Sequence, residues 1–375
     1  MKGDMICNQR VPGIHAGFNL SCELTKIREV LLPGFFLPPK KPMTSLLHPL
    51  IKKLSDGRFH SGADLGNELD VSRAAISKAM KKINALGLVV HSVKGKGYRM
   101  EDAVSLLDAD QIRDEVTKHS ASKIHHLNIL GTIDSTNSYA MRCIQEDQFS
   151  PEPGKYAITL AEQQTSGKGR RGRHWISPFG QNVYFTMVRL VDTGVINTEG
   201  LSLVIGLAVV RALKSFGIAD LAVKWPNDVL CKNRKLAGIL LEITGDVTGI
   251  CHLLIGVGIN SRCRPEDMEA VSQPWTDLYQ MTGKLFDRNT LAASTLSHIM
   301  QAMDELEAHG FKNFQEEWQR VDVMMGKRVE LISGTNRQFG VARGISEQGA
   351  LLFEDAAGIR AVSGGEISLR STDSQ

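Results

Sequence analysis

The chain has 375 residues, of which 42% are hydrophobic and 23% are charged. This length is enough for about two or three domains, and the composition is that of a globular protein, which excludes the disordered and fibrous classes. The net charge is only +3, but residues 43–100 carry 10 basic and 4 acidic side chains, whereas residues 101–375 carry 28 and 34. A basic block beside an acidic body predicts a small module that meets a polyanion, joined to a body with another task.

The cysteines and the apolar segments argue against a disulfide-linked protein and against a membrane-spanning one. Six cysteines are scattered without CxxC pairs or histidines at metal-binding spacing. We therefore expect reduced thiols in a cytoplasmic protein, with no disulfide framework and no metal ligands. The longest apolar stretch, 201–213, contains Arg211 and is shorter than the roughly 20 residues that a membrane-spanning helix needs. It predicts a buried helix instead.

Residues 1–42 differ from the rest of the chain. Pro and Gly recur there, the apolar residues have no sustained period, and the ordered regions of a signal peptide are missing. Two interpretations stay open: a flexible tail, and translated sequence upstream of a start at Met43. A helical pattern that begins directly after Met43 favours the second.

A winged helix is predicted over residues 43–102. Apolar spacing and cap residues predict these elements in order: helices at 46–54, 61–69 (capped by Ser61) and 73–86 (capped by Ser72 and closed by Gly87), then strands at 88–92 and 98–100. The strands are joined by the basic segment 93–97. This order is that of a helix-turn-helix followed by a β wing.

The third helix and the wing form a continuous cationic run. Residues 71–99 include seven Lys or Arg and no acid. Short hydroxyl donors at a helix start reach bases and phosphates, and lysines reach phosphates. We therefore predict DNA binding through Ser72, Arg73, Ser77, Lys78, Lys82, Lys94 and Lys96. The alternative is a winged helix that binds another protein and has a solvated basic face.

The region 108–322 mixes strands and helices, which predicts an α/β domain. The expected elements are a helix at 108–118, a strand at 124–129, a helix at 134–144, strands at 156–161 and 182–188, a helix at 201–216, a strand and turn at 222–230, and strands at 235–243 and 252–260. Short alternating runs separated by Gly and polar turns then predict a β-rich domain at 325–371.

A glycine-rich cationic segment lies between the strands at 156–161 and 182–188. Gly167, Gly169 and Gly172 satisfy GxGxxG, but a dinucleotide-binding loop requires a helix directly afterwards. Here Pro178 and Gly180 follow, and no Gly-Lys-Ser/Thr completes a Walker A motif. The segment is instead predicted to be a flexible flap whose guanidinium groups hold phosphate and carboxylate oxygens. A solvated basic loop is the alternative.

Five motifs occur in a characteristic order: Asp134-Ser135-Thr136-Asn137, the glycine- and arginine-rich flap, Lys224-Trp225-Pro226-Asn227-Asp228, Lys235-Leu236-Ala237-Gly238-Ile239, and Gly256-Val257-Gly258-Ile259-Asn260. This set resembles the biotin–protein ligase family. With the winged helix in front, the chain resembles the bifunctional type that is also the biotin operon repressor. The resemblance covers about residues 43–371 and implies a ligase core with a mixed sheet at 108–322 and a small SH3-like β-barrel at 325–371.

The resemblance also implies the reaction and its partners. Biotin and MgATP would give biotinyl-5′-AMP, and biotin would then pass to a lysine of the biotin carboxyl carrier protein of acetyl-CoA carboxylase. A homodimer holding biotinyl-AMP would bind operator DNA. The biotin carboxylate is ionised at pH 7, so the first step needs positioning and positive charge rather than a base.

Site residues follow from the same resemblance. The implied biotin contacts are Ser135, Thr136, Asn137, Gln164, Lys168, Gly169, Arg170 and Lys224. The implied ATP or adenylate contacts are Arg170, Arg173, Trp175, Lys224, Asn227 and Arg370, and the implied catalytic residues are Lys224 and Arg170.

One position departs from the family pattern, which usually has Gly-Arg-Gly-Arg in the flap. Here Lys168 replaces the first arginine and loses its planar fork, which puts retention of the adenylate in doubt. Two alternative functions stay open. A lipoate–protein ligase is disfavoured by the flap and by Lys-Trp-Pro-Asn-Asp. A ligand-sensing repressor without ligase activity is disfavoured because every expected cationic position is filled.

Overall fold

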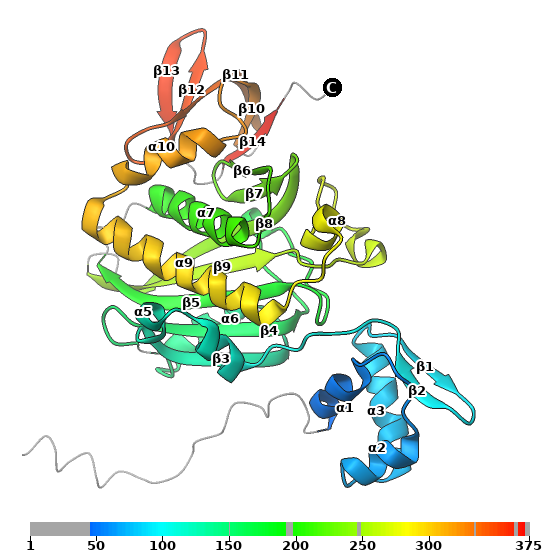
Figure 1. Ribbon diagram of the computed structural model, residues 1–375. Helices are drawn as coiled ribbons and strands as arrows, with labels where there is room; N and C mark the ends of the chain where they lie inside the picture. Colours follow the sequence, from blue (N-terminus) through cyan, green and yellow to red (C-terminus); the bar gives the residue numbers. More distant parts are fainter. Residues whose placement is uncertain are drawn as a thin grey trace, which may run out of the picture. The chain divides into compact units, whose positions relative to one another are not determined.

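The computed structural model describes residues 46–149, 151–192, 198–245, 249–333, 335–363 and 367–371 (Figure 1). The segment 1–42, with its two alternative interpretations, lies outside the described residues. Among the described helices, none is long and apolar enough to cross a membrane. Four cysteines, Cys143, Cys231, Cys251 and Cys263, are buried free thiols.

The predicted helix-turn-helix and wing are confirmed. The elements are α1 (Leu47–Leu54), α2 (Gly62–Glu68), α3 (Arg73–Ala85), β1 (Val90–Val93) and β2 (Gly97–Met100). Ser61 and Ser72 cap α2 and α3 by accepting hydrogen bonds from Asp64 N at 3.0 Å and Ala75 N at 3.1 Å. Gly87 has φ +86°, the left-handed conformation of a glycine that ends a helix. The apolar faces of the helices meet in one core that includes Leu50, Leu65, Ile76, Met80 and Ile83.

The central domain contains a mixed sheet of seven strands in the order β3-β4-β5-β9-β8-β7-β6. These strands are β3 (Ile124–Ile133), β4 (Tyr156–Gln164), β5 (Val183–Asp192), β6 (Leu221–Lys224), β7 (Asp228–Cys231), β8 (Arg234–Gly245) and β9 (Ile250–Ile259). β3 and β4 are parallel, and the other neighbours are antiparallel. The mixed sheet that the family resemblance implied is therefore present.

Helices cover both faces of this sheet because alternate residues of each strand are apolar on opposite sides. α6 (Thr136–Gln145) packs its Ala140 and Cys143 on a small core with Val188 and Leu254. The larger core on the other face includes residues of α7 (Thr198–Ser215) and α9 (Arg288–His309), and Figure 1 shows these two helices running side by side. The remaining helices are α4 (Ala109–Glu115), α5 (Lys118–Ala121), α8 (Leu278–Thr282) and α10 (Lys312–Val321).

One predicted helix is wrong in its extent. The single helix expected over 108–118 ends at Glu115, because Val116 adopts an extended conformation with ψ 140°. Thr117 then caps the short α5 by accepting a hydrogen bond from Ser120 N at 3.4 Å. A threonine hydroxyl favours the start of a new helix over the interior of an old one.

The C-terminal region forms a five-stranded antiparallel sheet in the order β13-β12-β11-β10-β14. Its strands are β10 (Arg328–Ser333), β11 (Asn336–Ile345), β12 (Leu351–Asp355), β13 (Gly358–Val362) and β14 (Ile367–Ser371). The short alternating runs predicted over 325–371 are confirmed as strands. Over the described residues β13 and β14 stand at opposite edges of the sheet, so closure into an SH3-like barrel stays a prediction.

Candidate active site

One cavity of about 1180 Å³ collects the sequence motifs of the central domain. Its wall is built from the start of α6, the end of β4, the flap, the turn between β6 and β7, and β8 and β9. The predicted site residues in its lining are Ser135, Thr136, Asn137, Gln164, Lys168, Gly169, Arg170, Arg173, Trp175, Lys224 and Asn227. The remaining one, Arg370, lies on β14, and its side chain is outside the described residues.

The start of α6 forms a buried polar wall. Ser135, Thr136 and Asn137 are each no more than 3% exposed. Gln164 fixes this helix start, because its Oε1 accepts from Thr136 N at 2.9 Å while its Nε2 donates to Ser177 Oγ at 2.8 Å. Asn137 Nδ2 donates to a carboxylate oxygen of Glu242 at 2.8 Å. These bonds hold hydroxyl and amide groups in place before any ligand arrives, as polar recognition in a buried site requires.

The flap is a short hairpin rather than an unstructured loop. Its base is closed by Trp175 N, which donates to Gly167 O at 2.8 Å, and its middle by Gly169 N, which donates to Arg173 O at 2.7 Å. At the tip, Arg171 and Gly172 have φ of +60° and +68°. The three arginines and Lys168 therefore project from a single compact turn.

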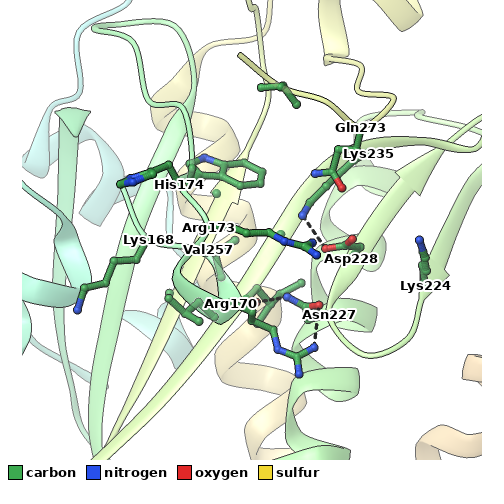
Figure 2. Close-up of a pocket in the computed structure, with 18 of the residues that line it drawn as sticks. Lys168, Arg170, Arg173, His174, Lys224, Asn227, Asp228, Lys235, Val257 and Gln273 are labelled. Atoms are coloured by element: carbon green, nitrogen blue, oxygen red, sulfur yellow. Dashed lines mark hydrogen bonds and ion pairs between the residues drawn. The ribbon is translucent and has the colours of Figure 1, made fainter. Parts of the chain in front are cut away.

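Arg170 links the flap to the turn between β6 and β7. Its Nη1 donates to Asn227 Oδ1 at 3.3 Å (Figure 2). Burial lowers the pKa of the Arg170 guanidinium, and the nearby Asp228 carboxylate opposes this shift. An arginine stays protonated at neutral pH in either case, so the cavity keeps this positive charge. Lys168 is more exposed and has its Nζ 3.7 Å from a carboxylate oxygen of Glu242.

Lys235 is a cavity lysine that sequence reasoning did not assign as a site residue. Its side chain is 15% exposed, and its Nζ lies 2.7 Å from Asp228 Oδ1 and 5.3 Å from the centroid of the Trp175 ring. Figure 2 shows Lys235 and Arg173 beside Asp228, whereas Lys224 stands apart on β6. The signal was the Lys-Leu-Ala-Gly-Ile motif itself. However, a lysine that enters a strand is ordinarily exposed, and only the strand register turns this one inward.

Comparisons with known proteins agree with this geometry. The biotin/lipoate A/B protein ligase family matches residues 131–260, an HTH domain matches 48–99, and the biotin protein ligase C-terminal domain matches 325–370. The bifunctional ligase/repressor BirA proteins of Salmonella typhimurium and Escherichia coli are each 40% identical over 324 residues, which is 86% of this chain and 97% of theirs. This chain belongs to the bifunctional ligase/repressor family.

A solved structure supports the same assignment for the ligase part. The biotin protein ligase from Aquifex aeolicus in complex with biotin and ATP is 31% identical to this ligase/repressor, with a TM-score of 0.57. The match covers 66% of this chain and 100% of that one. A biotin–[acetyl-CoA-carboxylase] ligase of Paracoccus denitrificans is 31% identical over 64% of this chain and 98% of its own length.

The helix-turn-helix of this ligase/repressor presents its predicted DNA-binding side chains to solvent. Ser72, Arg73, Ser77, Lys78 and Lys82 of α3, and Lys94 and Lys96 of the wing, are all exposed. The opposite face of α3 is buried through Ile76 and Met80. The Ser72 hydroxyl oxygen already accepts the hydrogen bond that caps the helix. Its hydrogen is still available to donate to a phosphate oxygen.

Proposed function

We propose that this ligase/repressor activates biotin with ATP to biotinyl-5′-AMP and then biotinylates a lysine of the biotin carboxyl carrier protein of acetyl-CoA carboxylase. The observation that carries the proposal is the convergence of the polar start of α6, the cationic flap and the Lys224–Asp228 turn on one cavity. At about 1180 Å³ the cavity exceeds the usual site for one drug-sized ligand, as a reaction between two substrates requires.

The chemistry has two steps. A carboxylate oxygen of biotin forms a bond to the α-phosphorus of ATP while the bond from that phosphorus to the bridging oxygen breaks, and pyrophosphate leaves. The carrier lysine then attacks the acyl carbon, AMP leaves with the electrons of the acyl C–O bond, and the amine proton passes to solvent. Both steps build negative charge on phosphate oxygens, which fixed cations in a partly enclosed cavity stabilise.

Each group of side chains has a role in this scheme. Ser135, Thr136, Asn137 and Gln164 bind biotin, while Lys168, Gly169 and Arg170 cover its carboxylate, and Arg173, Trp175, Asn227 and Arg370 bind ATP or the adenylate. Lys224 and Arg170 hold the reacting carboxylate and α-phosphate together. Lys235 lies beside Trp175 at the base of the flap. We therefore assign it as a third cation that stabilises the negative charge on the phosphate oxygens, with a role equal to that of Lys224.

The ATP of this reaction would be bound as its magnesium complex. Among the described residues, Asp228 is the one carboxylate in the cavity lining, and it already faces Lys235. This donor set fits a magnesium ion that is held mainly by phosphate oxygens and water, with Asp228 as its protein contact. When bound, the ion neutralises part of the triphosphate charge.

The helix-turn-helix supports repression of a biotin operon. Residues 43–100 have a net charge of +6, and one such module makes few contacts, so its DNA binding alone is weak and salt-dependent. A two-fold dimer brings two copies to two half-sites. Biotinyl-AMP favours the dimer, and linkage then requires that operator DNA favours it too. We assign this role to a domain at 43–102, ligation to 108–322 with 325–371 as its barrel, and the whole chain to the cytoplasm.

Two experiments test the proposal. Pyrophosphate release in the presence of biotin, and none with lipoate, is the expected result for the ligase. Release with lipoate alone would identify a lipoate ligase, and no release with either would identify a ligand sensor. Analytical ultracentrifugation with and without biotinyl-AMP, paired with operator binding at fixed salt, tests repression. Operator affinity that does not respond to the adenylate would contradict the dimer scheme.

A further inference from the structure

Two glycines face each other across neighbouring strands beneath Trp175. Gly238 on β8 pairs directly with Gly258 on β9, so both Cβ positions point to the same face of the sheet. A Cβ on Gly258 would lie 2.5 Å from Trp175 Cε2 and 2.6 Å from Nε1, and a Cβ on Gly238 would lie 3.0 Å from Cζ3. Carbon atoms in good contact are about 3.5–4.0 Å apart. The indole therefore lies directly against the backbone of both strands. A side chain larger than hydrogen at either position would occupy the space of the ring.

The close approach of the ring, rather than backbone conformation, is what requires glycine here. Neither Gly238 nor Gly258 has a positive φ, so an L-residue could adopt either backbone. A glycine inside a strand marks a place where another group comes close to the main chain. Gly256, two residues earlier on β9, accommodates a different neighbour, because its Cβ would lie 2.3 Å from Asn137 Oδ1.

The same tryptophan is the base of the flap hairpin. Its backbone N closes the hairpin on Gly167 O, and the bridge between Lys168 and His174 lies directly above. The four flap cations lie within residues 167–174, directly before this tryptophan in the chain. A displacement of the indole therefore also displaces the hairpin that carries all four cations.

We propose that Gly238 and Gly258 form a seat for Trp175 that holds the flap over the cavity, and that occupation of this seat determines how long biotinyl-AMP is retained. The second half of this statement rests on the proposed ligase function, and the first half does not. Both glycines act as positioning residues, through Trp175, and need not touch the substrate. Filling the seat with a methyl group displaces the indole, and the hairpin then opens more often.

Trypsin cleavage of the ligand-free protein tests the seat without reference to activity. The flap offers Lys168, Arg170, Arg171 and Arg173 as cleavage sites. Cleavage of a locally opened segment tracks the population of the open form, so Gly258→Ala should be cut roughly fivefold faster than wild type. Trp175→Ala should be cut equally fast, and the double variant no faster than either. Unchanged cleavage of Gly258→Ala would overturn the proposal.

The matched control is another glycine of the ligase core. Gly206 in α7 has room for a methyl group, because the nearest atom to its Cβ position would be Ile239 Cδ1 at 4.0 Å. Gly206→Ala should be cut at the wild-type rate. Should Gly258→Ala lose the cooperative melting of the wild type, Gly238→Ala gives a second trypsin test, in which the added Cβ would lie 3.0 Å from Trp175 Cζ3 and 3.3 Å from Lys235 Cε.

Release of preformed biotinyl-AMP tests the consequence. Gly258→Ala should release it about tenfold faster than wild type, within the range measured for directly coupled neighbours. In a Trp175→Ala background the same glycine change should have almost no effect. An equal acceleration in both backgrounds would show that the methyl group acts on the ligand and would refute the seat. Failure of the wild type to form the adenylate would refute the ligase proposal, while the trypsin result would still decide the seat.

Discussion

The buried ion pair between Glu162 and Arg288 offers the most quantitative test of how the site is supported. Arg288 Nη1 lies 2.7 Å from a carboxylate oxygen of Glu162, and both side chains are 3% exposed. The other oxygen of Glu162 accepts from Leu107 N at 2.7 Å. Glu162 also lies on β4, two residues before Gln164. The pair therefore joins α9 to the strand that carries a proposed biotin contact, and the Leu107 bond adds the residues that precede α4.

Removing the charge of Glu162 leaves the Arg288 guanidinium buried without a counter-charge, although it still donates to Asn182 O and Ser105 O, each at 2.9 Å. Breaking a buried pair in this way costs about 3–5 kcal/mol of unfolding free energy. In Glu162→Gln the amide oxygen still accepts from Leu107 N, so we expect a loss near the lower limit, about 3 kcal/mol. Adding Arg288→Met should recover part of that loss, because removal of both charges is far less costly than removal of one.

Urea unfolding of the full chain, analysed by linear extrapolation, measures these differences. The matched control is Glu316→Gln, which removes one partner of the ion pair with Arg320, whose side chains are 79% and 69% exposed. That change should alter the unfolding free energy by no more than about 0.5 kcal/mol. Equal losses for Glu162→Gln and Glu316→Gln would refute the argument from burial.

Three further predictions concern charge. Lys224→Gln and Lys235→Gln should each slow adenylation by roughly 10²–10³-fold, the effect of removing one donor to a developing charge, and slow transfer from supplied biotinyl-AMP less; equal losses in both half-reactions, measured by rapid quench, would contradict this. Lys168→Arg should slow adenylate release and strengthen adenylate-dependent dimerisation, since it restores a planar fork; ultracentrifugation showing a weaker dimer would contradict it. Burial raises the pKa of Asp322, so its ionisation opposes folding as pH rises through that pKa; Asp322→Asn should stabilise the protein at pH 7, with no gain below the unfolded-state pKa, in thermal melts across pH.

Local signals were sufficient for the helix-turn-helix and for the order of the strands. Ser61, Ser72 and Gly87 mark helix ends by interactions that span only a few residues, and the structure has all three in those roles. The family resemblance carried by the five motifs implied the site residues, and all of them except Arg370 line one cavity. The break at Val116 was missed because a threonine cap competed with helical periodicity there.

Which lysine lies beside Asp228 and Trp175 in the cavity was decided only by tertiary structure. Lys224 and Lys235 both lie at strand ends, and no local pattern distinguishes them. The register of β7 on β8 brings Lys235 to Asp228, and the register of β8 on β9 places Gly238 opposite Gly258 under Trp175. Trp175 is 63 positions from Gly238 and 83 from Gly258, and even the seven positions between Asp228 and Lys235 include the turn between β7 and β8. Their distances depend on how strands pair and not on the periodicity of any one segment, so the sequence motifs contain these residues while only the sheet determines which of them meet.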